Sequence, residues 1–179
     1  RETESLLKTL LLLKKPKKIL EVGTAVAYSS LVMAEVLEGK TKISTIENYE
    51  KRVLEAKKNI ADSNYSNTIH LIEEDASKVL KELVEKKEKY DFIFMDAAKG
   101  QYINWLEPVI KLLNKEGVLC SDNVLQGGDI VQSRYLIERR DRSIHSRLRE
   151  YLYELTHREE LSTTILSLGD GVALTVLKK

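Results

Sequence analysis

Two apolar segments are each followed by polar residues whose types and spacing suit a metal-assisted reaction. These residues are Asp96, Lys99, Asp122 and Asn123. Asp96 follows the segment 90–95, and Asp122 and Asn123 follow the segment 117–121. If both segments are strands of one parallel sheet, their carboxyl ends lie on the edge where such sheets bind ligands. Two carboxylates and an amide oxygen are hard ligands that suit Mg²⁺ better than Zn²⁺. The pattern therefore predicts that Asp96, Asp122 and Asn123 hold a magnesium ion.

Lys99 lies three residues after Asp96 and would place an ammonium group beside that metal. A nearby divalent cation lowers the pKa of a lysine, which lets the side chain act as a base. We therefore predict Lys99 and Asp96 as catalytic residues. The alternative interpretation is a structural cluster in which Lys99 forms salt bridges with two carboxylates, and each residue taken alone is more often structural than catalytic.

The segment Glu-Val-Gly-Thr-Ala-Val-Ala-Tyr-Ser, residues 21–29, joins a predicted strand to a predicted helix. Gly23 permits a tight turn and a close ligand, and the N–H groups of the helix favour an electron-rich ligand group. The pattern is not G-x-G-x-x-G, because Ala25 occupies the second glycine position, and this disfavours a pyrophosphate ligand. Glu47 ends the next strand and can accept both hydroxyls of a ribose. A nucleoside without phosphates fits this combination, and S-adenosylmethionine is such a ligand.

Asp75 follows the third predicted strand and can accept the exocyclic amine of adenine. Alternatively it caps the helix that begins near Ser77, which is the better interpretation of the residue taken alone. The turn at Gly23 also has an alternative interpretation, because a Rossmann-like strand with capping acids needs no cofactor. The predicted cofactor-binding residues are Glu21, Gly23, Ser29, Ser30, Glu47, Asp75, Ala76 and Asp96.

Strand and helix patterns alternate along the chain. Apolar residues at helical spacing predict helices over 2–14, 28–37, 50–63, 77–87, 102–113 and 143–158, and short apolar runs predict strands over 18–23, 42–47, 68–73, 90–95 and 117–121. Two further runs, 161–168 and 172–177, flank Gly169-Asp-Gly171 and predict a hairpin. We therefore expect one α/β domain over residues 1–179, with a Rossmann-like, doubly wound, mostly parallel seven-stranded sheet and a C-terminal antiparallel hairpin.

Composition excludes several classes of protein. The 179 residues carry a net charge of +1, which excludes a globally basic nucleic-acid binder but allows a local basic patch. A single cysteine, Cys120, excludes an internal disulfide framework and a cysteine-rich zinc site. The leucine-rich run near the N-terminus is much shorter than the roughly 18 apolar residues of a membrane span, and no signal-peptide pattern is present. The default expectation is a cytoplasmic protein without membrane contact.

Together these motifs resemble the metal-dependent S-adenosylmethionine O-methyltransferases, the class of the catechol and caffeoyl-CoA methyltransferases. The resemblance spans essentially the whole chain and is carried by residues 21–29, Glu47, Asp75-Ala76, Asp96-Ala-Ala-Lys99 and Asp122-Asn123. More narrowly, residues 96–102, 121–125 and 169–171 resemble the bacterial tRNA 5-hydroxyuridine methyltransferases. Two departures are Ala27, where the family usually has a second glycine, and the start at Arg1, which implies that helices present in the family precede this segment.

The resemblance implies a reaction and its substrates. In this class Mg²⁺ chelates two adjacent oxygens of the acceptor, and an Asp, Asp, Asn set holds the metal; here Lys99 would take the proton. The narrower resemblance implies methylation of the 5-hydroxyl of 5-hydroxyuridine at the wobble position in the anticodon region of tRNA, giving 5-methoxyuridine. A small catechol-like or phenolic acceptor is the alternative, because it too offers two adjacent oxygens. The family also implies a homodimer, for which the exposed-looking Tyr135, Tyr151 and Tyr153 are candidates.

An arginine-rich segment bears on the choice between these acceptors. Residues 134–149 contain six arginines, at 134, 139, 140, 142, 147 and 149, against Glu138 and Asp141. Arginine suits phosphate contacts, which favours tRNA, although a charge run is more often a solvated helix face. Tyr102 and Trp105 can stack on a base, with core packing the more conservative interpretation of Trp105. Two other classes stay open: an NAD-type oxidoreductase, which the missing glycine pattern disfavours, and a domain that binds S-adenosylmethionine without turnover.

Overall fold

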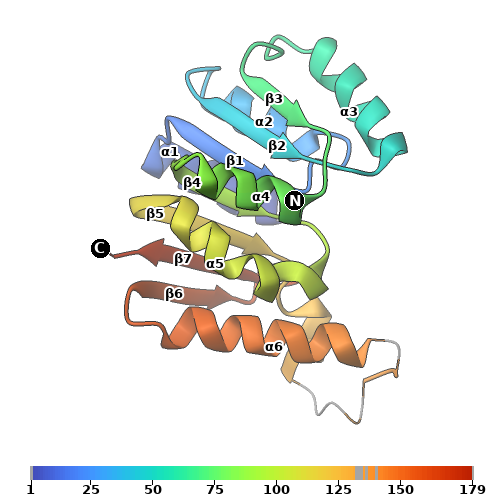
Figure 1. The fold of residues 1–179 in the computed structure, drawn as a ribbon, viewed down its shortest axis with the longest axis vertical. Helices are drawn as coiled ribbons and strands as arrows, with labels where there is room; N and C mark the ends of the chain where they lie inside the picture. Colours follow the sequence, from blue (N-terminus) through green and yellow to red (C-terminus); the bar gives the residue numbers. More distant parts are fainter. Residues whose placement is uncertain (1, 132–134, 136, 140, 179) are drawn as a thin grey trace.

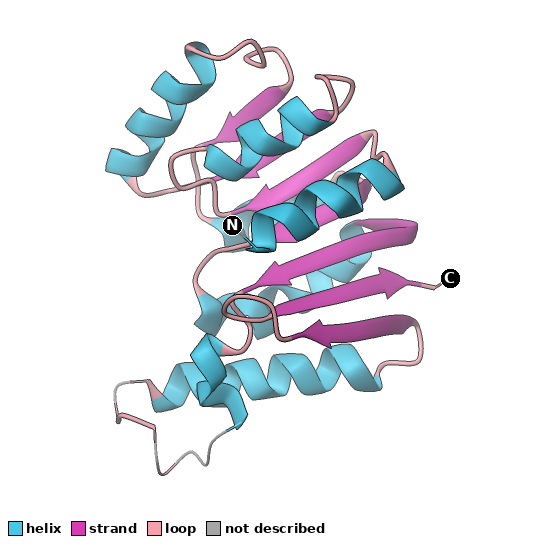
Figure 2. Ribbon diagram, turned by 180° about the vertical axis from the view of Figure 1, so that it is seen from behind, coloured by secondary structure: helices cyan, strands magenta, loops and turns pink. Residues whose placement is uncertain are grey.

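A seven-stranded sheet forms the centre of the protein in the computed structural model, which describes residues 2–131, 135, 137–139 and 141–178 (Figure 1). The strand order across the sheet is β3-β2-β1-β4-β5-β7-β6. The strands are β1 (Lys18–Val22), β2 (Lys42–Ile46), β3 (Ile69–Ile72), β4 (Tyr90–Met95), β5 (Leu113–Asp122), β6 (Leu161–Leu166) and β7 (Val172–Leu177). Strand β7 pairs antiparallel with both β5 and β6, and its arrow runs against its neighbours in Figure 2. The predicted fold class is therefore confirmed.

In the part of the chain that the structure describes, three helices cover each face of the sheet. Helices α1 (Glu2–Lys14), α2 (Tyr28–Val36) and α3 (Glu50–Ala61) pack on one face. Helices α4 (Ala76–Glu85), α5 (Tyr102–Leu112) and α6 (Arg142–His157) pack on the other (Figure 1). Two 3₁₀ turns, Lys99–Gln101 and Gln126–Val131, follow β4 and β5. Both turns lie at the carboxyl ends of the parallel strands, where the predicted catalytic residues are.

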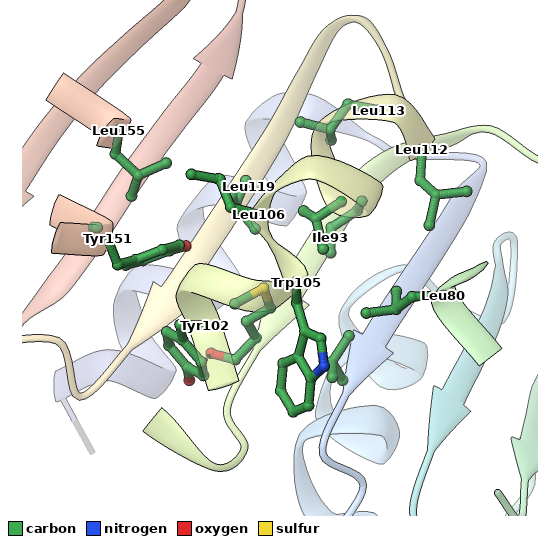
Figure 3. Packing of buried hydrophobic residues seen from close by; sticks show 14 of the residues in the cluster. Leu80, Ile93, Tyr102, Trp105, Leu106, Leu112, Leu113, Leu119, Tyr151 and Leu155 are labelled. Carbon is green, nitrogen blue, oxygen red and sulfur yellow. Dashed lines mark hydrogen bonds between the residues drawn. The ribbon is translucent and has the colours of Figure 1, made fainter. Parts of the chain in front are cut away.

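The apolar strands bury both of their faces, which divides the core in two. Leu20, Ile93 and Leu119 belong to the cluster beneath α4, α5 and α6, and Figure 3 shows Ile93 and Leu119 there among aromatic side chains. Their chain neighbours Ile19 and Phe92 belong to the second cluster, beneath α1, α2 and α3. This alternation within continuous apolar runs is what a parallel sheet covered on both sides requires. The sheet therefore holds the strand ends, and the residues on them, in fixed positions.

Most predicted element boundaries agree with the structure to within one or two residues. The largest difference is β5, which begins at Leu113 directly after α5, four residues earlier than predicted. Its pairing with β4 shifts register between Tyr90 and Phe92, so that residues between Leu113 and Val118 have no counterpart in the regular ladder. Residues 126–131, which follow β5, form the second 3₁₀ turn. Within the described residues, no helix combines the length and the apolarity that crossing a membrane requires.

Candidate active site

Two adjoining cavities open at the carboxyl ends of the parallel strands. The larger, about 650 Å³, is lined by seven of the predicted site residues: Gly23, Glu47, Asp75, Ala76, Asp96, Lys99 and Asn123. The smaller, about 210 Å³, is lined by Gly23, Ser29, Asp96 and Asp122. Gly23, Ala25 and Asp96 belong to both linings. The structure therefore brings most of the predicted residues to one place, with Asp96 where the two cavities meet.

The turn after β1 depends on Gly23 for a different reason than the sequence suggests. Gly23 has a φ of +104°, and a Cβ built on it would lie 2.2 Å from the backbone oxygen of Asp96. The close neighbour that excludes a side chain is therefore the end of β4, whereas the sequence interpretation assigned that role to a ligand. The N–H groups of Gly23 and Thr24 donate to the Ile46 carbonyl at 3.1 and 3.0 Å, which also ties the turn to β2.

Ala27 occupies a left-handed conformation immediately before α2. Its φ is +67°, and its methyl group is fully buried in the apolar cluster beneath the turn. It lines neither cavity described above. The methyl group that replaces the family's usual glycine hydrogen therefore fills core space, and it leaves both cavities open.

Glu21 ends inside the protein rather than in a cavity. Its side chain is fully buried and accepts hydrogen bonds from the hydroxyls of Ser29, Ser30 and Thr45. It therefore joins β1 to β2 and to the first turn of α2. Burial raises the pKa of Glu21 to about 7, although the three hydroxyl donors act in the opposite direction. Glu21, Ser29 and Ser30 were all predicted to bind the cofactor, but only Ser29 lines one of the two cavities. Glu21 and Ser30 instead support the loop from the core side.

We expect Glu21→Gln to remove part of the pH dependence of stability. An unfolded glutamate titrates near pH 4.5 and the folded one near 7, so the folded protein binds more protons between these values. The native state thus loses about 3 kcal/mol of stability as the pH rises through this window, and the loss is then constant. Urea unfolding at about pH 5 and pH 8 measures the effect. The variant should match the wild type at the lower pH and exceed it at the higher; equal free energies of unfolding at both would contradict the buried titration.

Glu47 holds the backbone that surrounds the larger cavity. Its Oε2 accepts from the Ala25 N–H at 3.0 Å, and its Oε1 accepts from the N–H groups of Asn48 and Tyr49, also at 3.0 Å. An ionised carboxylate has about four acceptor sites, so these three bonds leave room for a ligand hydroxyl. The assignment of Glu47 to ribose binding stays a prediction. The residue also has a structural role that the sequence did not indicate, because it holds the backbone around the cavity.

Asp75 is the N-cap of α4. Its Oδ1 accepts from the N–H groups of Ser77 at 2.9 Å and Lys78 at 3.3 Å. The capping interpretation is therefore correct, and the residue also lines the larger cavity beside Ala76. Nearby, the Trp105 indole N–H donates to Ser77 Oγ at 3.0 Å and fixes the indole at the cavity wall. Trp105 is thus a largely buried core residue, as the more conservative interpretation had it.

Lys99 lies between Asp96 and Tyr102. Its Nζ donates to Asp96 Oδ1 at 2.7 Å and to Tyr102 Oη at 3.0 Å. The Asp96 side chain is 43% exposed, against 17% for Lys99, so the carboxylate stands nearer to solvent. Tyr102 is fully buried and therefore cannot stack on a base, which corrects that prediction. Burial raises the Tyr102 pKa well above its usual range, so the phenol stays protonated.

Asp122 and Asn123 end β5 beside this group. The pKa of Asp122 is raised by burial and by the like charge of Asp96, while the Asn123 N–H and Lys99 act against the shift. Asn123 has a φ of +58°, a left-handed conformation that asparagine adopts more readily than most residues. With its nitrogen turned inward, the Asn123 amide donates to both Asp122 carboxylate oxygens, at 2.9 and 3.2 Å. Rotation of the amide would present its oxygen at the same place.

This donor set fits a hard divalent cation. Among the described residues, no three His, Cys, Asp or Glu side chains converge on one point, so a softer or all-carboxylate metal site is not formed there. Asp96, Asp122 and the rotated amide of Asn123 instead supply oxygen atoms only, which is the preference of Mg²⁺. Burial is the main reason that the pKa of Asp122 is raised, and the like charge of Asp96 adds to it; a bound cation would relieve this repulsion between the two carboxylates.

Several residues near the site carried no clear signal in the sequence. The Thr3 hydroxyl, at the start of α1, donates to Asp122 Oδ1 at 3.5 Å. Arg52 lies over the Tyr49 ring, with 5.8 Å between its Cζ atom and the ring centroid, and both residues line the larger cavity. Tyr102 was singled out only for stacking, although its spacing of three residues from Lys99 places the two side chains together. Thr3 reaches Asp122 only through chain folding over a long separation, which spacing does not reveal. Tyr49 and Arg52, in contrast, follow Glu47 closely and could have been found from their place after β2.

Two arginines of the arginine-rich segment form hydrogen bonds within the protein. Arg142 donates to the backbone oxygens of Ile137 and Tyr135, at 3.0 and 3.3 Å, and Arg147 donates to the Gly100 oxygen at 3.0 Å. Arg134 and Arg140 lie outside the described residues. Tyr135 and Tyr153 are exposed as predicted, at 86% and 59%, but Tyr151 is fully buried, which corrects that part of the prediction. The Tyr151 hydroxyl instead forms a 2.6 Å hydrogen bond with Ser121 Oγ in the core.

Comparisons with known proteins agree on the family. A family profile described as O-methyltransferase matches residues 1–179. The chain is 33% identical over 172 residues to a flavonoid 3',5'-methyltransferase of Vitis vinifera, covering 92% of this chain and 72% of the relative.

Solved structures resemble this chain in fold and, in part, in sequence. A Staphylococcus aureus protein assigned to the caffeoyl-CoA O-methyltransferases superposes with a TM-score of 0.89 at 31% identity, covering 98% of this chain and 82% of that one. A Bacillus cereus O-methyltransferase, solved in complex with SAH (S-adenosylhomocysteine), gives 0.87 at 25% identity, covering 98% of this chain and 80% of that one. The full-length profile match, together with the acidic residues gathered at the ends of β4 and β5, places this chain in the O-methyltransferase family.

Proposed function

We propose that the protein transfers the methyl group of S-adenosylmethionine to a hydroxyl of a small phenolic acceptor that has two adjacent oxygens. The observation that carries this proposal is the gathering of four residues around the two cavities. Asp96 lines both, Lys99 and Asn123 line the larger, and Asp122 lines the smaller. The larger cavity, with Glu47 and Asp75 in its wall, has room and acceptors for a nucleoside. An acceptor bound at the junction would lie beside Lys99.

The side chains have distinct tasks in this proposal. When bound, S-adenosylmethionine supplies a sulfonium methyl group, and Mg²⁺ held by Asp96, Asp122 and Asn123 lowers the pKa of an acceptor hydroxyl. Lys99 accepts the proton at Nζ, which Asp96 and Tyr102 keep in place through bonds of 2.7 and 3.0 Å. Glu47 receives the ribose hydroxyls, and the network under Glu21 keeps the loop at 23–27 in position. Much of the catalysis is therefore positioning of the two reactants.

The relatives support a small acceptor. The Vitis vinifera relative is named for methylation of a flavonoid, which is a phenolic compound. The Bacillus cereus structure holds the demethylated form of the proposed cofactor. A phenolic acceptor also agrees with the smaller cavity, which is lined in part by Leu7, Val32 and Phe94, because these side chains offer apolar contact to an aromatic ring.

A tRNA acceptor is the second candidate, and the arginine-rich segment is the observation that favours it. Arg139 and Arg149 are exposed there. Arg142 and Arg147, however, each use part of their guanidinium donors on backbone oxygens, which leaves fewer N–H groups for phosphate contacts, although Arg147 is also exposed. The small phenolic acceptor therefore agrees better with the described side chains, and the two acceptors are compared directly in the test.

The test measures formation of S-adenosylhomocysteine from S-adenosylmethionine with Mg²⁺ present. We expect turnover with 3,4-dihydroxybenzoate and little with 3- or 4-hydroxybenzoate, because only the first has two adjacent hydroxyls. Asp122→Asn should abolish this turnover, whereas the exposed control Asp62→Asn should retain it. Preferential methylation of 5-hydroxyuridine in tRNA would replace the phenolic acceptor with tRNA. Absence of product from every hydroxylated acceptor would overturn the proposed activity and favour a binding domain without turnover.

A further inference from the structure

One buried hydroxyl joins the strand ends that carry the proposed metal ligands. Tyr102 Oη lies 2.9 Å from the Met95 backbone oxygen at the end of β4, and 3.3 Å from the Asp122 backbone oxygen at the end of β5. It also accepts from the Ala97 N–H at 3.3 Å and from Lys99 Nζ at 3.0 Å. Two strand ends, the loop that follows β4 and the proposed base therefore meet at one oxygen atom.

The bonding capacity of a phenol matches this environment. A tyrosine hydroxyl has one hydrogen to donate and two lone pairs to accept with. The Met95 and Asp122 carbonyls share the donor, while Ala97 and Lys99 occupy the two acceptor positions. The side chain is fully buried, so water does not compete for these positions. No other side chain of the 20 common types offers this combination on a rigid ring of the same length.

The ring itself is held by packing. Tyr102 lies in the core against Tyr151 of α6, edge to face, with 5.4 Å between ring centroids, and Figure 3 shows both side chains in this cluster. Lys99 Nζ lies 5.2 Å from the Tyr102 ring centroid, so the ring face also contributes to holding the ammonium group. Packing around the ring therefore holds the hydroxyl in position from the core side.

We propose that Tyr102 is a positioning residue that sets the relative placement of Asp96 and Asp122 and holds Lys99 against Asp96. The inference rests on the proposed metal-dependent function. Asp96 directly follows Met95, and Asp122 carries one of the bonded carbonyls itself, so a change at Tyr102 Oη displaces the two carboxylates relative to one another. An octahedral Mg²⁺ site tolerates little displacement of its ligands.

The experiment measures Mn²⁺ affinity by electron paramagnetic resonance, with Mn²⁺ as the probe for the magnesium position. In Tyr102→Phe, which keeps the ring and removes only the hydroxyl, we expect the dissociation constant for Mn²⁺ to rise by about 10- to 100-fold. Tyr151→Phe is the matched control, because it also removes a buried hydroxyl in the same cluster. It should change the affinity by less than about threefold, although both variants lose stability in urea.

A third variant tests rescue and covers the case in which Tyr102→Phe does not fold. Tyr102→4-aminophenylalanine retains donors for the Met95 and Asp122 carbonyls but loses most of the acceptor capacity that Ala97 and Lys99 use, so we expect partial rescue, with Mn²⁺ affinity within about tenfold of the wild type. Affinity lost equally in this variant would overturn the inference. So would wild-type affinity in a folded Tyr102→Phe.

Asp122→Asn separates these results from failure of the proposed function. If the wild type binds Mn²⁺ and Asp122→Asn does not, the metal site stands, and an unaffected Tyr102→Phe overturns only the role of Tyr102. If the wild type itself binds no Mn²⁺, the proposed metal site and the inference on Tyr102 are both overturned.

Discussion

Lys99→Arg and Lys99→Met should both lower kcat for methyl transfer by about 1000-fold, within the range that general bases contribute. The reason is that Lys99 lines the larger cavity and its Nζ lies 2.7 Å from Oδ1 of Asp96, which lines both cavities. Arginine keeps the positive charge and the ion pair with Asp96, but its pKa above about 12 prevents it from accepting a proton. Methionine removes both the charge and the base. Equal loss in the two variants would identify the proton acceptor as the missing element.

The measurement compares kcat at saturating acceptor with the affinity for S-adenosylhomocysteine, which should change little because Lys99 holds no predicted cofactor contact. Lys57→Met serves as the control, since Lys57 is an exposed lysine that pairs with Glu73 on the surface. Its kcat should equal that of the wild type. Activity close to wild type in Lys99→Arg, with loss in Lys99→Met, would instead show that only the charge of Lys99 matters and would exclude it as the base.

The arrangement of the site follows from the sequence because parallel strands share an edge. Asp96 and Asp122 each follow a continuous apolar run, and such runs become neighbouring buried strands whose ends meet. The same rule predicts Glu47 at the end of β2. The prediction for Glu21 failed to indicate its surroundings because the residue lies within β1 and not after it. Its side chain therefore points beneath the turn, into hydroxyls that come from α2 and β2.

Other features depend on packing between elements that are far apart in the chain. Tyr151 was predicted on the surface, yet it belongs with Leu148, Leu152 and Leu155 to the buried stripe of α6. The helical spacing of that stripe was present in the sequence, but the surrounding charges obscured it. Tyr102 Oη acquires its role only when β4 and β5 are adjacent, because its partners come from both strands. Spacing along the chain indicates which residues share an element, and it leaves contacts between elements undetermined.

Gly23→Ala should destabilise the folded protein by about 4 kcal/mol or more, a large part of the 5–15 kcal/mol typical of a domain. Two physical effects add. The backbone at Gly23 has a φ of +104°, which an alanine adopts only with strain. The new Cβ would also lie 2.2 Å from the Asp96 oxygen and 3.1 Å from the Ala97 Cβ, and backbone atoms cannot move aside as a flexible side chain can. The end of β4 must then shift, and Asp96 shifts with it.

Gly128→Ala separates these two effects. Gly128 has nearly the same φ, +102°, but a Cβ there would meet no atom within 4 Å. This control therefore carries the backbone strain without the collision, and we expect it to cost only about 1 kcal/mol. Urea unfolding of both variants gives the difference directly. A cost at Gly23 no greater than at Gly128 would show that β4 yields without penalty. A large difference, with Mn²⁺ affinity reduced in any Gly23→Ala protein that still folds, would show that contact between the turn and β4 helps to place Asp96, the proposed metal ligand.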